Sequence, residues 1–403
     1  MMSKLHYPSH KRLILIAATA CFILMAACGG GQPAAPALPA SPAPVRDYWP
    51  TGGWRSDAPA NRGLDEAALA GLRAQIEQGM PFLDSLLIVK DGYLVYEEYF
   101  NGYDADRLHP VHSVTKSVMS ALFGVAQADG SIPNLDAKLG DALPDYFADG
   151  QHKDKVNITL RHLLQMRSGI QFDQEAHNDE LAARGADAAE FFLGQDLTEY
   201  ALGYPVAHAP GEAWNYSTLD SQLLSAAFSR LTGQSLADYA AESLFAAIGV
   251  GETVWSSDTN GVSIGGDTLE LTPRDMAKFG YLYLNRGQWD GQQVIPLDWV
   301  NLSTSAQGDR AYYVPSGESV PIDFYGYHWW TWQPDWFHGH ATSHARGFGG
   351  QWINVFSDLD LVIVSTANSQ VDNAGNVAQE EAITAMIRDQ ILPALDIVQV
   401  EGE

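Results

Sequence analysis

The pattern of apolar and polar residues predicts strands near both ends of the globular part and helices between them. Two apolar or aromatic runs are joined by Asp91-Gly92, a pair suited to a type I′ hairpin turn, and a second pair of runs flanks Asp358. The predicted strands are 85–90, 93–100, 351–357 and 361–366. Apolar spacing of three and four predicts helices at 65–78, 114–128, 159–166, 219–231, 235–247, 273–286 and 376–392.

This order of elements predicts one architecture. Strands from the two chain ends would pair into a single antiparallel sheet, and the helical middle would form an inserted subdomain. The expected fold class is therefore α/β (α+β), an antiparallel sheet flanked by helices with a mostly helical insertion. The globular domain is expected over residues 56–400.

The first 28 residues are typical of an export signal. A basic start precedes residues 13–27, an uncharged and mainly apolar run that is shorter than the ~20 residues of a membrane-spanning helix. Residues 24–28 resemble the lipobox of bacterial lipoproteins, with Met25 where Leu is usual and Cys28 as the lipidated residue. The alternative is an ordinary cleaved signal followed by free secretion.

Residues 29–55 are rich in Pro, Ala and Gly, a composition that favours an extended tether. With a lipid on Cys28, such a tether would hold the globular domain at a bacterial membrane, on the periplasmic side of the cell envelope. The only partners expected are therefore the membrane, through the lipid anchor, and a small-molecule substrate.

Charge and cysteine content exclude several classes of function. The net charge of −26 would repel the phosphate backbone of a nucleic acid, so no nucleic-acid partner is expected. The two cysteines, Cys21 and Cys28, both lie in the signal segment, so the globular part has no disulfide, thiol nucleophile or thiolate metal site.

Ser113-Val114-Thr115-Lys116 begins a predicted helix. A spacing of three places the hydroxyl of Ser113 and the amine of Lys116 on one helical face, and the helix N-terminus favours the negative charge that develops when a hydroxyl attacks. A buried lysine loses its proton more readily, so Lys116 could serve as the base. The alternative is that Ser113 is simply an N-cap.

Two later segments could complete a catalytic site. Tyr216 lies on a turn before a helix, where its phenol could pass a proton to a leaving group, although it could equally be a packed aromatic residue. Residues 344–351 contain three glycines in four positions and lead into the last hairpin. An edge strand here could provide a backbone N–H for an oxyanion hole, or the glycines could form only a tight turn.

Together these segments resemble the serine β-lactamase-like, penicillin-recognising family, in the SxxK class C type. Its members carry a Ser-x-x-Lys, a Tyr-x-Asn and a Lys-Thr-Gly or Trp-Gly-Gly motif in this order. Residues 160–169 are similar to a His-Leu-Leu…Ser-Gly stretch of class C-type members. The segments at 214–224 and 347–351 look closest to 6-aminohexanoate-dimer hydrolases and related esterases, which cleave amide and ester bonds through an acyl-serine.

The resemblance implies roles for individual residues. Ser113 would be the nucleophile, Lys116 its base and Tyr216 the proton relay, so a serine hydrolase without a cofactor is expected. The oxyanion and substrate-binding group would comprise Thr218, Arg346, Phe348, Gly349, Gly350 and Gln351. Two departures stand out. Thr218 replaces the usual asparagine, so an amide that would hydrogen-bond the substrate or Lys116 is lost, which would weaken the site. Phe348 replaces the cation that holds a penicillin carboxylate, a role that Arg346 could take over.

Other interpretations remain open at this point. The same fold could act as a β-lactamase or a D-Ala-D-Ala peptidase, or it could bind cell-wall or peptide ligands without turnover. His338, His340 and His344 could in principle bind zinc, but no metal is expected because no acidic residue close by completes the set. The aromatic residues at 325–336 would form a core layer or line an apolar cleft.

Overall fold

The computed structural model describes residues 45–185, 193–308, 323–332 and 334–395. The chain divides into two units, Met1–Pro42 and Ala43–Glu403, and every described residue lies in the second. The predicted signal, the lipobox Cys28 and most of the predicted tether lie outside the described residues. Among the described helices, none combines the length and the apolar character needed to cross a membrane.

A seven-stranded antiparallel sheet forms the centre of the fold, in the strand order β2-β1-β12-β11-β10-β9-β8. The two predicted hairpins form β1 with β2 and β11 with β12, and these four strands are neighbours in the sheet, so the expected fold class is confirmed. Asp91 and Gly92 both have positive φ, 52° and 88°, as a type I′ turn requires. The strands are β1 (Leu83–Lys90), β2 (Tyr93–Tyr99), β8 (Asp323–Tyr325), β9 (Trp330–Trp332), β10 (Thr342–Gly347), β11 (Gln351–Phe356) and β12 (Leu361–Ala367).

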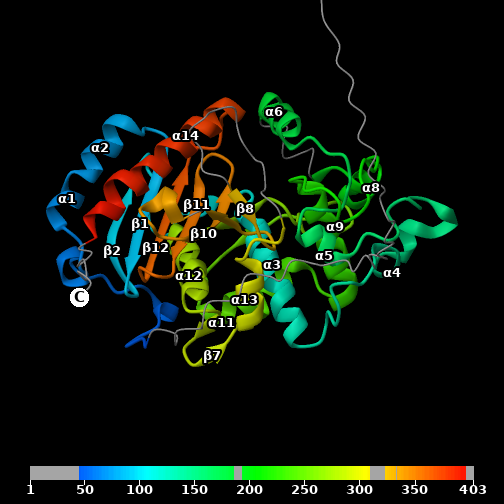
Figure 1. Ribbon diagram of the computed structural model, residues 1–403, viewed down its shortest axis with the longest axis horizontal. Helices are drawn as coiled ribbons and strands as arrows, with labels where there is room; N and C mark the ends of the chain where they lie inside the picture. Colours follow the sequence, from blue (N-terminus) through cyan, green and yellow to red (C-terminus); the bar gives the residue numbers. More distant parts are fainter. Residues whose placement is uncertain (1–44, 186–192, 309–322, 333, 396–403) are drawn as a thin grey trace, which may run out of the picture. The chain divides into compact units, whose positions relative to one another are not determined.

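Helices cover both faces of this sheet (Figure 1). Alternate residues of β1 point to opposite sides, with Leu86 and Ile88 in one hydrophobic core and Leu87 and Val89 in the other. The first core contains α1 (Glu66–Ala70), α2 (Leu72–Gly79) and α14 (Asn373–Met386). The second contains α3 (Val114–Ala128), α9 (Thr218–Thr232) and α12 (Pro273–Leu284).

Gly280 allows α12 to approach the sheet closely. A Cβ atom at this position would lie 2.6 Å from Ile353 Cγ2 and 2.7 Å from Val362 Cγ1, closer than carbon atoms pack. A side chain here would therefore push the helix away from β11 and β12.

The helical part between the two ends of the sheet follows the prediction, with some differences. The helix α3 begins at Val114 as predicted, and α9 begins at Thr218, one residue before its predicted start. The predicted helix 235–247 contains one π-helical turn, in which backbone hydrogen bonds join residues five positions apart. The region between the two ends of the sheet also contains α4 (Leu139–Ala142), α5 (Leu160–Leu164), α6 (Gln174–Arg184), α8 (Leu197–Leu202), α10 (Leu236–Ala240), η5 (Ala241–Phe245), α11 (Ala246–Ile248) and α13 (Leu297–Ser303). Short strands β3 (His109–Pro110), β4 (Val254–Trp255) and β5 (Leu269–Leu271) form a small sheet, and β6 (Gln288–Trp289) pairs with β7 (Gln292–Gln293).

Residues before position 56, the expected start of the globular domain, also pack against that domain. Arg46 forms a bidentate ion pair with Asp360, with nitrogen to oxygen distances of 2.7 Å, and Trp49 packs against Tyr281 with ring centroids 5.9 Å apart. These contacts attach the last part of the predicted tether to the domain. Proline and alanine content alone did not indicate this, because the anchoring side chains are scattered among those residues.

Candidate active site

Ser113 lies at the start of α3, where the chain makes a sharp turn. His112 has φ 46°, a left-handed conformation that is uncommon for a residue with a side chain, and Ser113 is the N-cap residue of the helix. Nearly every side chain of α3 is buried, including the polar Thr115, Lys116 and Ser117. A helix that is buried on all sides fixes the positions of the groups it carries.

Lys116 contacts Ser113 directly. Its Nζ lies 2.9 Å from Ser113 Oγ, 2.8 Å from the carbonyl oxygen of Gly266 and 3.2 Å from Thr218 Oγ1. The side chain is 1% exposed, and this burial lowers the pKa of Lys116 to about 7, against the opposing field of Asp267. A substantial fraction of Lys116 is therefore neutral at neutral pH and able to accept a proton.

Thr218 preserves the hydrogen bond that its replacement of asparagine was expected to remove. The hydroxyl of Thr218 accepts from Lys116, so that contact is not lost. An amide is also present nearby, because Gln174 on α6 accepts hydrogen bonds from Thr218 N at 2.8 Å and from Thr218 Oγ1 at 2.7 Å. The N-cap Ser217, which accepts from Asp220 N, sets the start of α9 and thereby the place of Thr218.

Tyr216 faces the same pocket as Ser113. Lys116 Nζ lies 5.1 Å from the centroid of the Tyr216 ring. The ring packs in an aromatic group with Trp330, Tyr325 and Trp214, at centroid distances of 5.3, 6.1 and 6.3 Å. This group includes part of the aromatic-rich segment at 325–336, so that segment both fills the core and lines the pocket at Trp330.

The third predicted motif lies at the end of β10. This strand is not an edge strand, since β9 and β11 flank it, but β9 pairs only with residues 342–344. Among the described residues, the last residues of β10 therefore have no strand partner on that side. A Cβ on Gly347 would lie 2.3 Å from the carbonyl oxygen of Val111. This close approach brings the end of β10 beside the turn that carries Ser113.

The turn after β10 separates residues that line the pocket from residues that do not. Gly347 and Phe348 line it, whereas Gly349 N donates to Asn376 Oδ1 at 2.6 Å and Gly350 N donates to Gly347 O at 3.3 Å. Gln351 is fully buried and its amide exchanges hydrogen bonds with the backbone of Ala367. The expected substrate-binding role of these last three residues is thus replaced by a structural one.

Arg346 does line the pocket, but its charge is paired. Glu380 on α14 accepts from Arg346 Nε at 3.1 Å and forms a second, short contact with the guanidinium, and both side chains are 6% exposed. The guanidinium that could hold a substrate carboxylate is therefore already paired with a carboxylate of the protein. Sequence alone could not show this pairing, because the two residues are 34 positions apart.

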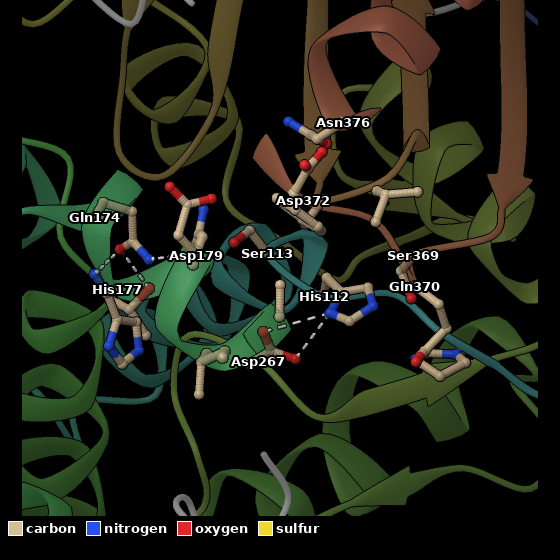
Figure 2. Close-up of a pocket in the computed structure, with 18 of the residues that line it drawn as sticks. His112, Ser113, Gln174, His177, Asp179, Asp267, Ser369, Gln370, Asp372 and Asn376 are labelled. Carbon is tan, nitrogen blue, oxygen red and sulfur yellow. Dashed lines mark hydrogen bonds and ion pairs between the residues drawn. The ribbon is translucent and has the colours of Figure 1, made fainter. Parts of the chain in front are cut away.

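The pocket around Ser113 has a volume of about 910 Å³. Figure 2 shows Ser113 in the middle, between Gln174 and Asp179 of α6 on one side and Asp372 and Asn376 at the start of α14 on the other. A volume of this size accommodates a small organic molecule. Amide, hydroxyl and carboxylate groups from several separate segments line it.

Three residues near the site were not singled out by sequence reasoning: His112, Gln174 and Asp267. His112 Nδ1 lies 3.3 Å from a carboxylate oxygen of Asp267. Burial raises the pKa of Asp267, but its interactions with His112 and Lys116 outweigh this effect, so the pKa is lowered. Asp220 is fully buried, and this burial raises its pKa to about 7 against the hydrogen bond from Ser168. Of these neighbours, Ser168 was the one that a sequence motif indicated, because it belongs to the Ser-Gly at the end of residues 160–169.

The three histidines considered for zinc do not converge. His338 Nε2 contacts the carbonyl of Arg388, His340 contacts Asp358, and His344 is fully buried with its ring centroid 4.1 Å from that of Trp332. Within the described ranges, no group of three or more His, Cys, Asp or Glu residues is arranged to hold a metal ion.

Comparison with known proteins identifies a family and relatives of this chain. A family model described as Beta-lactamase matches residues 72–385. An uncharacterised protein of Alkalihalophilus pseudofirmus is 28% identical over 251 residues, which cover 55% of this chain and 65% of that protein. The 6-aminohexanoate-dimer hydrolase of Paenarthrobacter ureafaciens is 22% identical over 296 residues, covering 71% of this chain and 72% of that enzyme.

A solved structure has the same fold. EstCE1, described as a hydrolase with promiscuous acyltransferase activity, superposes with a TM-score of 0.60 at 15% identity, covering 84% of this chain and 99% of that chain. At this level of identity the likeness shows the fold alone.

Proposed function

The chain belongs to the beta-lactamase family, whose members are serine hydrolases, and from this premise we propose that it cleaves amide or ester bonds of small molecules through an acyl-serine on Ser113. The observation that carries the proposal is the distance of 2.9 Å between Lys116 Nζ and Ser113 Oγ in a pocket. A hydroxyl within hydrogen-bond reach of a buried, partly neutral amine is an activated nucleophile.

Acylation uses these two residues together. As Ser113 Oγ bonds to the substrate carbonyl carbon, its proton passes to the lone pair of Lys116 Nζ. Because burial lowers the pKa of Lys116 to about 7, the amine is basic enough to take the proton and is already neutral in part of the population. The N-terminus of α3, a helix of 15 residues, adds a favourable field for the negative charge that develops.

Two backbone N–H groups are placed to hold the carbonyl oxygen as it becomes an oxyanion. Those of Ser113 and Phe348 belong to residues that line the pocket, and among the described residues neither donates to a backbone acceptor. The N–H groups of Gly349 and Gly350 are already engaged. Ser113 and Phe348 are therefore the proposed oxyanion donors.

Tyr216 is the proposed proton relay to the leaving group. Its ring lines the pocket, and Lys116 Nζ lies 5.1 Å from the ring centroid, which supports a role for the phenol in passing a proton from Lys116 to a leaving amine or alkoxide. In the second half of the reaction, water attacks the acyl carbon, loses its proton by the reverse route and restores Ser113.

The charges in the pocket favour esters and amides over penicillins. Among the described residues that line the pocket, Arg346 is the one arginine or lysine, and Glu380 neutralises it. A desolvated carboxylate on a substrate would need a paired cation, and the pocket instead adds Asp179, Glu270 and Asp372. β-Lactamase or D-Ala-D-Ala peptidase activity is therefore the less favoured alternative.

Covalent labelling tests this proposal. A fluorophosphonate probe is expected to form one adduct per chain, on the peptide that contains Ser113, because the activated hydroxyl displaces fluoride at phosphorus. Mass spectrometry of the intact protein and of its digest measures the stoichiometry and the site. The Ser113→Ala variant is the control and should remain unlabelled.

A protein that only binds ligands would give a different result. It would bind a cell-wall peptide or an ester without any covalent adduct on Ser113. Such a result with folded protein would exclude the acyl-serine mechanism and favour the non-catalytic alternative.

We further propose that the enzyme is tethered to the bacterial envelope by a lipid on Cys28. The support is the sequence of the first 28 residues, a basic start and an apolar run ending in a lipobox-like segment. The full chain, expressed in a bacterial host, is expected to enter the detergent phase on detergent partitioning, and Cys28→Ser is expected to move it to the aqueous phase. Cys21→Ser, inside the apolar run, is the matched control, and equal partitioning of both variants would refute the anchor.

A further inference from the structure

A chain of hydrogen bonds connects Lys116 to α6. Thr218 N and Thr218 Oγ1 both donate to Gln174 Oε1, at 2.8 and 2.7 Å. A backbone N–H can only donate, so the atom it contacts must be the amide oxygen of Gln174. Because that oxygen has no hydrogen, the single hydroxyl proton of Thr218 must point to Gln174.

The direction of this proton determines what Thr218 can do toward Lys116. With its hydrogen given to Gln174, Thr218 Oγ1 can only accept from Lys116 Nζ, which lies 3.2 Å away. The carbonyl of Gly266, 2.8 Å from Nζ, can also only accept. A neutral amine has two hydrogens and one lone pair, so these two acceptors take both hydrogens.

The third neighbour of Lys116 Nζ is Ser113 Oγ, at 2.9 Å. The remaining direction, and therefore the lone pair of the neutral amine, faces this oxygen. We propose that Gln174 is a positioning residue, which fixes the Thr218 hydroxyl as an acceptor and so directs the lone pair of Lys116 toward the proton of Ser113. This inference rests on the proposed function of Ser113 and Lys116.

Removing the amide of Gln174 would free the Thr218 hydroxyl to rotate. It could then donate its proton to the Lys116 lone pair, which would compete with the proton transfer from Ser113. The other charged or titratable groups near Lys116 are Tyr216, Asp267, His177 and His328, whereas the side chain of Gln174 hydrogen-bonds to Thr218 and Asn178. The effect of the substitution is therefore expected to act through Thr218.

The test measures kcat/KM for a p-nitrophenyl ester across about pH 5 to 9 in Gln174→Leu. The plateau at high pH is expected to fall about tenfold, the cost of one misdirected hydrogen bond at the base. The acid limb is expected to move to lower pH, because donation from Thr218 stabilises the neutral amine. A role of Gln174 in packing alone would leave the acid limb in place.

Two further variants separate positioning from folding. Gln174→Glu keeps an acceptor for Thr218 and adds a negative charge, so its plateau is expected within about threefold of the unmodified protein while its acid limb moves to higher pH. Thr218→Asn replaces the hydroxyl with an amide oxygen that has no proton to redirect. Adding Gln174→Leu to Thr218→Asn is therefore expected to cost less than about twofold.

Gln171→Leu is the matched control, since it makes the same chemical change at an exposed position just before α6 that does not line the pocket. An unchanged plateau in Gln174→Leu, or an equal loss whether or not Thr218→Asn is also present, would overturn the positioning role. Failure of the unmodified protein to react with the fluorophosphonate would instead overturn the proposed function, so the two failures are distinguishable.

Discussion

Ser113→Ala is expected to lower kcat/KM for a p-nitrophenyl ester by about 10⁴-fold or more. The reason is that the reaction loses the atom that forms the covalent bond, while Lys116, Tyr216 and the pocket remain. Binding of a slowly hydrolysed ester should change little, because Ser113 Oγ contributes one hydroxyl among many groups that line the pocket. Steady-state kinetics measure the first effect and equilibrium titration the second.

Ser120→Ala is a suitable control for this variant. Ser120 is a buried serine on the same helix, and its hydroxyl has no hydrogen-bond partner among the described residues. The substitution removes the same atom seven positions later and is expected to leave kcat/KM within about twofold. Residual activity of Ser113→Ala above one hundredth of that of the unmodified protein would show that another group carries the reaction.

The pair at the centre of this site could be predicted from sequence because it is local. Ser113 and Lys116 lie three positions apart on one helix, and helical geometry alone places their side chains on one face. The contact of 2.9 Å between them follows from that geometry once α3 is buried. The hairpin strands were predictable for a similar reason, since alternation and a type I′ turn are also local properties.

Contacts between distant segments could not be predicted in this way. Thr218 was expected to weaken the site, yet the amide that accompanies it comes from Gln174, 44 positions earlier and on a different helix. Arg346 could have offered its charge to a substrate carboxylate, but Glu380 pairs with it. In both cases the partner depends on how helices pack beside the sheet, which no spacing within one segment encodes.

The strands β8 and β9 could not be predicted from the periodicity of the sequence. Each has only three residues, which is too short for an alternation pattern to be recognised, and they lie in a segment dominated by aromatic residues. The pairing of β9 with β10 nevertheless determines that the end of β10 stays open beside Ser113. The opening at the active site therefore depends on the part of the sheet that periodicity reveals least.

Lys116→Met is the second substitution that is expected to cause a large loss of activity. It is expected to lower the plateau of kcat/KM by about 10³-fold, within the range that general-base catalysis contributes. In the unmodified protein, activity should rise with pH through about 7, as Lys116 loses its proton. Lys116→Met should lose this rise while retaining the fold, because methionine fills a similar volume without a charge.

The same substitution is expected to change stability in a pH-dependent direction. Burial lowers the folded-state pKa of Lys116 to about 7, below the value of an exposed lysine, so between these two values the unfolded chain binds more protons than the folded one. The contribution of Lys116 to the free energy of unfolding therefore rises with pH across this window and is least favourable below pH of about 7. Lys116→Met should melt at a higher temperature than the unmodified protein at pH of about 6, with a smaller difference near pH 9. An acid limb that persists near pH 7 in Lys116→Met, or a variant less stable than the unmodified protein at the lower pH, would show that Lys116 is not the buried base.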